Sequence, residues 1–171
     1  MKNINEVKGV KLSENFLDNI INLTGEPIFV KDVNFKFVLA NDALCEMLGM
    51  KREDIIGKTL GESLPKDQMD TFLKNDRAVL ESGKENINEE PLTGKGGKIL
   101  TIITKKTRYV DEEGSKFLIG VIHDITEKKA ALDELQEKVT ELEKVNKIMV
   151  DRELKMVELK KQINELGGVQ K

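Results

Sequence analysis

The stretch GVIHDITEKK, residues 120–129, decides the fold of this 171-residue chain. The β-rich residues that lead up to Asp124 predict the end of a strand, and the Glu and Lys residues after Thr126 predict the start of a helix. Threonine is a common helix-capping residue, so we expect the Thr126 hydroxyl to cap this helix and Asp124 to hold the end of the sheet. The stretch therefore predicts a strand that passes directly into a helix.

Composition changes near residue 126. All seven aromatic residues lie between Phe16 and Phe117, whereas residues 127–171 hold 20 charged residues in 45. Neither glycine nor proline occurs at residues 121–166. We therefore predict four segments: a tail at 1–11, a globular domain with its own N-terminal helix at 12–126, a charged helix at 127–166 and a tail at 167–171.

The globular part alternates helical and β-rich segments. Its first element is an amphipathic helix that Ser13 can cap and that ends before Pro27. The segments that follow are predicted to be strands at 28–32 and 35–40, a helix from Asn41 to Gly49, a helix at 66–82, and strands at 86–92, 99–110 and 116–125. We expect an α+β fold, in which a helical insert covers one face of a five-stranded antiparallel sheet.

These motifs resemble the PAS family over roughly residues 13–129. The resemblance is carried by EPIFVKD (26–32), FVLANDALCEMLGM (37–50) with Asn41 at the strand–helix junction, Gly57-Lys58, the glycine turn at 111–114, and GVIHDITEKK. It implies a PAS-like sheet with a helical insert and a sensory or protein-interaction role. It also implies a site between the sheet and the insert that, in some members, holds haem, flavin or a small metabolite.

The sequence does not identify a cofactor. Haem-binding relatives usually place a histidine on the long helix, which here (66–82) contains none. Flavin photosensors of the light-oxygen-voltage type carry an Asn-Cys-Arg-Phe-Leu-Gln-like run, which is missing, and Cys45 lies one helix too early. Neither haem nor a cysteinyl-flavin adduct is therefore supported, and a small apolar or mixed ligand stays open. The candidate residues that line its pocket are Leu44, Leu48, Ile56, Phe72 and Val79.

Cys45 and His123 are the only residues of their kinds. Cys45 follows Leu44 in an apolar helix, which favours a small buried hydrophobe over redox sensing or a covalent adduct. For His123 the resemblance favours a solvated or dimer-facing role over a metal or phosphoacceptor role, because family members often place a polar residue of the outer sheet face at this position. With no cysteine or second histidine nearby, His123 makes no zinc site. No nucleophile lies beside a base, so we expect no catalytic residues, no metal and no enzyme activity.

Charge and hydropathy constrain location and partners. The formal net charge is −3, and Lys105, Lys106 and Arg108 are too few to form a nucleic-acid surface, so we expect a solvated edge there and no nucleic-acid partner. The N-terminus has no apolar leader core and no window is long enough to span a bilayer, so no membrane partner is expected. A single cysteine fits a reducing compartment, and we expect a cytoplasmic protein.

Apolar residues recur along the charged helix in steps of three and four, if the polar Arg152 is counted as the position between Met149 and Met156. Val139, Leu142 and Val145 form a doubled step of three, a phase slip of the stammer type or a packing irregularity. Such a helix exposes its apolar stripe unless a partner covers it, so we expect a parallel homodimer. The predicted interface is Leu132, Leu135, Val139, Leu142, Val145, Met149, Met156, Leu159, Ile163 and Leu166.

The charged helix also resembles the helix that follows PAS domains in bacterial sensor histidine kinases. A phosphoacceptor histidine and an ATP-binding domain would follow in such kinases, so any kinase activity is expected in a longer parent or a separate partner. The resemblance further implies that Asp124, Ile125 and Thr126 couple the sensor domain to its output helix.

Our leading interpretation is a sensory module that dimerises and passes a ligand- or partner-induced change to a signalling output such as a two-component kinase. A scaffold without a ligand is the alternative, and an enzyme that uses Cys45 is a third possibility.

Overall fold

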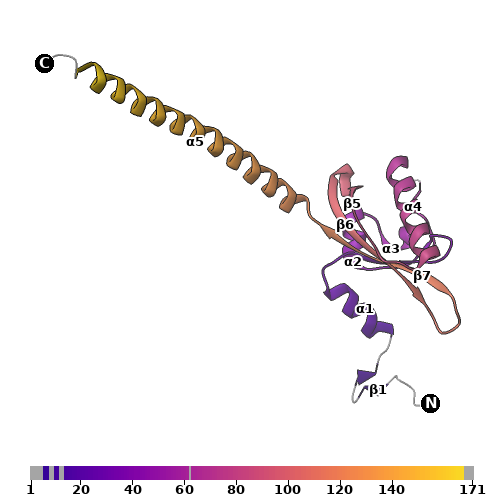
Figure 1. Cartoon of the computed structure of the whole chain (residues 1–171). Helices are drawn as coiled ribbons and strands as arrows, with labels where there is room; N and C mark the ends of the chain where they lie inside the picture. The colour runs from indigo at the N-terminus through magenta and orange to yellow at the C-terminus, as the bar shows by residue number, and fades with distance from the viewer. Residues whose placement is uncertain (1–5, 8–9, 12–13, 62, 168–171) are drawn as a thin grey trace. The chain divides into compact units, whose positions relative to one another are not determined.

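The structure is a computed structural model that describes residues 6–7, 10–11, 14–61 and 63–167. It divides the chain into two units, residues 1–126 and 127–171. In the first unit the elements are β1 (Glu6–Val7), β2 (Val10–Lys11), α1 (Glu14–Leu23), β3 (Ile28–Lys31), β4 (Phe37–Ala40), α2 (Asp42–Leu48), α3 (Arg52–Ile55), α4 (Lys66–Ser82), β5 (Asn86–Thr93), the 3-10 turn η1 (Lys95–Gly97), β6 (Ile99–Val110) and β7 (Lys116–Asp124). The last helix, α5 (Thr126–Gly167), begins at the end of the first unit and runs through the second (Figure 1).

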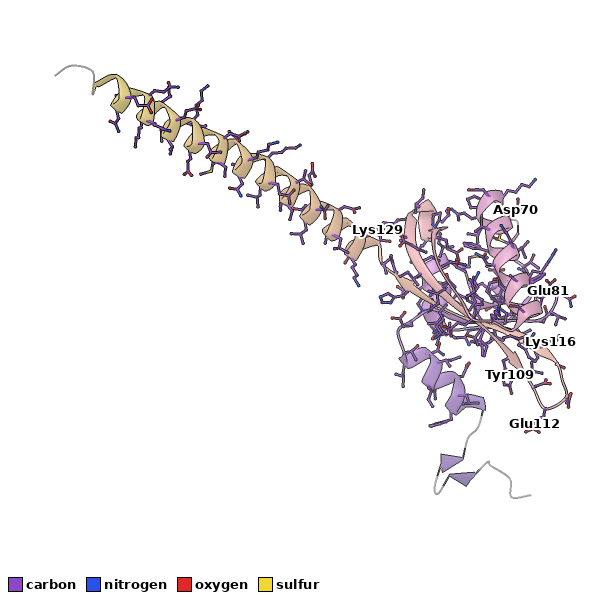
Figure 2. All side chains as sticks on the ribbon, viewed as in Figure 1. Asp70, Glu81, Tyr109, Glu112, Lys116 and Lys129 are labelled. Atoms are coloured by element: carbon purple, nitrogen blue, oxygen red, sulfur yellow. The ribbon has the colours of Figure 1, made fainter. Side chains whose placement is uncertain are left out.

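Five strands form one antiparallel sheet in the order β4-β3-β7-β6-β5, which confirms the predicted fold class. The chain's last strand, β7, lies between β3 and β6 at the centre of the sheet. The β6–β7 hairpin is long, and Figure 2 labels Tyr109, Glu112 and Lys116 around its turn. Because β7 is central and leads into α5, the start of the long helix is attached to the middle of the sheet.

Asn41 joins three elements at the start of the domain and is fully buried. Its Oδ1 accepts hydrogen bonds from the backbone N–H of Ile28 (2.9 Å) and Leu44 (3.1 Å), so it orders β3 and caps α2. Its Nδ2 donates to the carbonyls of Ile21 (2.8 Å) and Glu26 (2.7 Å). An asparagine is suited to this position because its amide supplies both acceptor and donor groups at one buried point.

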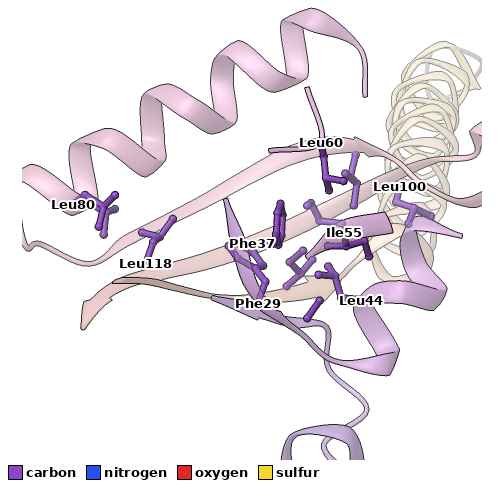
Figure 3. Packing of buried hydrophobic residues seen from close by; sticks show 13 residues of the cluster. Phe29, Phe37, Leu44, Ile55, Leu60, Leu80, Leu100 and Leu118 are labelled. Carbon is purple, nitrogen blue, oxygen red and sulfur yellow. The ribbon is translucent and has the colours of Figure 1, made fainter. Parts of the chain in front are cut away.

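The helical insert covers one face of the sheet and closes the core. Helix α4 lies over that face, and the buried apolar side chains fill the space between helix and strands (Figure 3). Leu80 and Leu118 pack at one end of this layer, and Leu44, Ile55 and Leu60 lie toward the other (Figure 3). Gly83, with φ at 71°, ends α4 in the left-handed conformation that favours glycine, and the bounds of the helix, Lys66–Ser82, are those predicted.

The N-terminal segment holds one feature that was not predicted. The strands β1 and β2 form an antiparallel pair of two residues each within the segment predicted to be a tail. Strands this short carry no alternating pattern that a sequence could show. Ser13, the predicted cap of the first helix, lies outside the described residues.

No helix among the described residues is both long enough and apolar enough to cross a membrane.

Candidate functional site

A cavity of about 50 Å³ lies between the sheet and the helical insert. Eleven of its lining residues are apolar: Phe29, Phe37, Leu44, Leu48, Leu60, Leu64, Met69, Phe72, Leu92, Ile102 and Ile122. The other five are polar: Lys31, Thr59, Glu90, Thr104 and Lys106. A small apolar space with a few polar groups is the usual form of a ligand site.

Three of the five predicted pocket residues, Leu44, Leu48 and Phe72, line this cavity. Ile56 does not. It follows α3 in extended conformation and is 37% exposed, while its neighbour Ile55 takes the buried position. Val79 is only 1% exposed but lies seven residues beyond Phe72 on α4, about 10 Å along the helix axis, outside the cavity lining. The structure therefore corrects two of these predictions.

Four charged side chains, which we call the buried charge cluster, meet beside the cavity. Its members are Lys31 from β3, Asp76 from α4, Glu90 from β5 and Lys106 from β6, and each side chain is 7% exposed or less. With all four ionised, two positive and two negative charges balance. Burial of an ion is tolerated in a protein only when such partners surround it.

Asp76 is the centre of this cluster. Lys31 Nζ donates a hydrogen bond to Asp76 Oδ2 at 2.6 Å. Lys106 Nζ lies 2.8 Å from Asp76 Oδ1, an ion-pair distance, but without normal hydrogen-bond geometry. Since Asp76 is fully buried, it joins α4 to two strands of the sheet through charge pairs that water does not screen.

Glu90 is held more loosely. Its Oε2 is 3.4 Å from the side-chain amide of Asn75, and its Oε1 is 3.8 Å from Lys106 Nζ, beyond hydrogen-bond distance. Oε1 is buried and has no hydrogen-bond partner among the described residues. A buried carboxylate oxygen in this condition is costly, and the Glu90 side chain is one of the five polar residues of the cavity lining.

The two lysines of the cluster also contact aromatic rings. Lys31 Nζ lies 4.7 Å from the ring centroid of Phe37, and Lys106 Nζ lies 5.4 Å from that of Phe72. Such distances allow attraction between a cation and the face of a ring. Burial lowers the pKa of Lys31, although the charge of Asp76 and its hydrogen bond oppose the shift.

The location of Lys106 corrects the sequence interpretation, which placed it on a solvated edge. Its side chain is 3% exposed, because it follows Leu100, Ile102 and Thr104 on the inward face of β6. Its neighbour Lys105 points outward and pairs with Glu85 at 2.9 Å. Arg108 donates to the carbonyl of Leu80 at 3.0 Å near the end of α4. The three basic residues thus have three different roles.

The junction between β7 and α5 is a second candidate site. The carboxylate of Asp124 accepts hydrogen bonds from the backbone N–H of Thr126 (2.9 Å) and from its hydroxyl (2.6 Å). The Thr126 hydroxyl oxygen in turn accepts from the N–H of Thr101 in β6 at 2.9 Å. The N–H of Ile125 donates to the Thr101 carbonyl, also at 2.9 Å.

These bonds reverse the predicted roles of two residues. Asp124 caps the first N–H of α5, and the Thr126 hydroxyl holds the sheet through Thr101. Partial burial raises the pKa of Asp124, but the hydrogen bonds from Thr126 outweigh it and leave this pKa below its ordinary value. The start of α5 is therefore fixed to Thr101 of β6. The residue after Thr101, Ile102, lines the cavity.

Helix α5 carries its apolar residues on the surface of the single chain. The predicted interface residues from Leu132 to Ile163 are all exposed, from 40% at Val139 to 67% at Leu142. The side chain of Leu166 lies outside the described residues. Further apolar residues (Ile148, Val150, Leu154 and Val157) are exposed as well, between or beside the predicted positions. The dimer interface remains a prediction that these exposures motivate.

Cys45 and His123 are neighbours of the two sites, but neither lines the cavity. Cys45 is partly buried against the core, and its thiol is free. His123 is mostly exposed, with Nδ1 3.0 Å from Glu26 Oε1. Among the described residues, no group of three or more His, Cys, Asp or Glu side chains is arranged to hold a metal ion.

Comparison with known proteins gives the family of this fold. The family model described as "PAS fold" matches residues 21–130. Over 123 residues, 70% of this chain, the sequence is 37% identical to the uncharacterized protein y4lL of Sinorhizobium fredii. Over 132 residues, 77% of this chain, it is 23% identical to a methyl sulfide methyltransferase-associated sensor of Methanosarcina acetivorans. The aligned regions are only 15% and 13% of the lengths of these two relatives.

Solved structures show the same fold. A structure of VqmA from Vibrio cholerae, described as a complex with ligand and DNA, is 29% identical with a TM-score of 0.59 and covers 67% of this chain and 51% of its own. A second, described as a VqmA dimer without target DNA, is 29% identical with a TM-score of 0.60 and covers 68% of this chain and 53% of its own. With the five-stranded sheet, the helical insert and the match over residues 21–130, this chain belongs to the PAS fold family.

Proposed function

We propose that this chain is a sensory module in which a ligand in the cavity, or a protein partner, changes the arrangement of α5 and so controls a signalling output. The observation that carries the proposal is the short connection between cavity and helix. Ile102 lines the cavity, and its neighbour Thr101 binds both Ile125 and Thr126 by hydrogen bonds.

The junction transmits a change without a large movement. Ligand binding needs only to favour one of two arrangements of β6, and a difference of about 1–3 kcal/mol in affinity between them is enough for regulation. A shift of Thr101 would strain or release its bonds to Ile125 and Thr126 at the start of α5. The first N–H groups of a helix have no partner within the helix, so hydrogen bonds from outside it hold its first turn. A change in these bonds therefore acts on the direction of the helix.

Dimerisation completes the proposal. Most of the stability of a helix in a protein comes from packing of its apolar face, and in the single chain the apolar stripe of this 42-residue helix is exposed; pairing with a second copy buries that stripe. We propose a parallel homodimer through the positions from Leu132 to Leu166, in the cytoplasm. The structure of VqmA described as a dimer supports this by analogy of fold.

The output belongs to a partner or to a longer protein. A sensor histidine kinase is the output that the sequence resemblance favours, and the methyl sulfide methyltransferase-associated sensor is a relative whose name fits signalling. The VqmA structure described as a complex with ligand and DNA shows that this fold also occurs in a DNA-bound protein. The proposed role needs no catalytic residue in this chain, and the absence of a nucleic-acid partner stays a prediction.

Cysteine crosslinking along α5 tests the coupling. In a Cys45→Ser background, single cysteines at successive α5 positions report which faces meet in the dimer. Thr126→Ala removes the hydroxyl that binds Thr101, whereas the matched control Thr126→Ser keeps it. We expect Thr126→Ala to change the crosslinking pattern and Thr126→Ser to preserve it. If Thr126→Ala and Asp124→Ala both leave the pattern unchanged in folded protein, the coupling is wrong.

A further inference from the structure

We propose that the cavity selects a small, electrically neutral molecule that carries a hydrogen-bond donor beside an acceptor, as a primary amide or a lactam does, and that Glu90 and Lys106 bind it. This inference rests on the proposed sensory function and names the ligand class of its cavity. It follows from three features of the site: an unpartnered oxygen, a nearby ammonium and a balanced charge.

The unpartnered oxygen is Glu90 Oε1. The Glu90 side chain is 4% exposed and lines the cavity, and this oxygen has no hydrogen-bond partner among the described residues. An ionised carboxylate only accepts hydrogen bonds. The missing partner must therefore be a donor, an N–H or O–H group, which a molecule in the cavity beside Glu90 can supply.

The ammonium of Lys106 supplies the complementary half of the site. It also lines the cavity and lies 3.8 Å from Glu90 Oε1, too far for a direct hydrogen bond. An ammonium has three N–H donors, and its 2.8 Å approach to Asp76 Oδ1 lacks normal hydrogen-bond geometry. An acceptor next to the ligand's donor would bind Lys106 while the donor binds Glu90.

The charge of the cluster argues for a neutral ligand. Lys31 and Lys106 balance Asp76 and Glu90, so a bound anion or cation would add an uncompensated charge in a buried site. The apolar remainder of the lining, with Phe72 beside Lys106, suits a small hydrocarbon part. A cavity of about 50 Å³ admits only a few non-hydrogen atoms unless the lining moves.

Four molecules of nearly the same shape separate these requirements. Acetamide has a donor and an acceptor and no charge; acetone lacks the donor; acetate lacks the donor and is an anion; acetamidinium lacks the acceptor and is a cation. Each is titrated into the full chain, with the methyl NMR signals of Leu92 and Ile102 as reporters of the cavity lining. We expect acetamide to bind in the millimolar range, as a ligand this small does, and the other three at least about tenfold more weakly.

Paired variants test the two named residues. Glu90→Leu with Lys106→Met removes one charge of each sign and leaves the Lys31–Asp76 pair balanced, so we expect the fold to be preserved. We expect this variant to lose acetamide affinity by at least about tenfold. The control, Glu85→Leu with Lys105→Met, removes the same residue types from an exposed ion pair between β6 and the residue just before β5. This control variant should bind acetamide as the unmodified chain does.

The inference is overturned if acetone, acetate or acetamidinium binds as tightly as acetamide, or if the Glu90/Lys106 variant retains full acetamide affinity. It is also overturned if none of the four probes shifts the lining signals up to about 100 mM, since water alone would then satisfy the site. These results would leave the proposed sensory function standing, because the α5 crosslinking test uses neither the probes nor the charge cluster.

Discussion

Replacement of Asp76 by alanine should be among the most destabilising single changes in the domain. Asp76 is fully buried and is the carboxylate that both lysines of the cluster approach, at 2.6 Å and 2.8 Å. Without it, two buried ammonium groups share only Glu90, which is 3.8 Å from the nearer one. Breaking a buried ion pair from one side typically costs about 3–5 kcal/mol, so we expect a loss of that size in the free energy of unfolding.

Urea unfolding of the full chain, followed through the methyl NMR signals of Leu118 and Ile102, measures this loss in the first unit separately from α5. Glu85→Ala is the control, because Glu85 pairs with Lys105 at 2.9 Å on the surface and should cost less than about 1 kcal/mol. Lys31→Met with Asp76→Leu removes both members of one pair and should cost less than Asp76→Ala alone. If Asp76→Ala costs no more than Glu85→Ala, the cluster is not the buried electrostatic link described above.

Three further changes test other parts of the fold. Asn41→Ala removes the partners of four backbone groups that are buried or partly buried, so it should cost about 3 kcal/mol in urea unfolding. Asn22→Ala loses one exposed hydrogen bond and should cost less than about 1 kcal/mol, and equal costs would contradict the assigned role of Asn41. A Cβ at Gly120 would clash with the Phe29 ring, so Gly120→Ala should lower the free energy of unfolding by about 1–3 kcal/mol. Calorimetry should show a smaller effect in a Phe29→Leu background. Burial lowers the pKa of Lys31 in the folded state below its ordinary value of 10.5 in the unfolded state, so between these two pKa values the folded state binds fewer protons. The free energy of unfolding should therefore rise with pH between them. In a pH series of urea unfolding, Lys31→Met should flatten this rise.

The elements of the fold follow from local signals that a sequence displays directly. The helix α4 ends at Ser82 as predicted, because Gly83 supplies a left-handed residue after an apolar period of helical type. The three long strands are predicted to within a residue or two, since β-rich runs are separated by glycine-containing turns. Asn41 was expected at a strand–helix junction, and the structure adds the four bonds that explain it.

The charge cluster was missed because its members are distant in sequence and charged residues are ordinarily exposed. A signal was nevertheless present. Lys106 continues the alternate positions of Ile102 and Thr104 on β6, and Lys31 does the same after Phe29 on β3. Asp76 lies four residues after Phe72 on the inward face of α4. When charged residues occupy the core-facing positions of strands and helices, with opposite charges on elements that face one another, they indicate a buried polar site.

The reversal at the β7–α5 junction has a different cause. Asp124 and Thr126 are both capping residues, and their spacing alone does not decide which side chain reaches the helix N–H. The choice depends on Thr101, which lies 25 residues earlier and offers its backbone N–H to the Thr126 hydroxyl. That contact depends on the register of β6 against β7, which only the folded sheet sets.

Sedimentation equilibrium of the full chain tests most directly whether α5 pairs with a second copy, on which signal transfer through this helix depends. One chain has a mass of 19.3 kDa, and we predict twice this mass at micromolar concentration. Leu142→Asp, which places a charge at the most exposed of the predicted interface positions, should shift the protein toward the single-chain mass. A single-chain mass for the unmodified protein at every concentration, with α5 partly unfolded by circular dichroism, would show that α5 does not pair with a second copy.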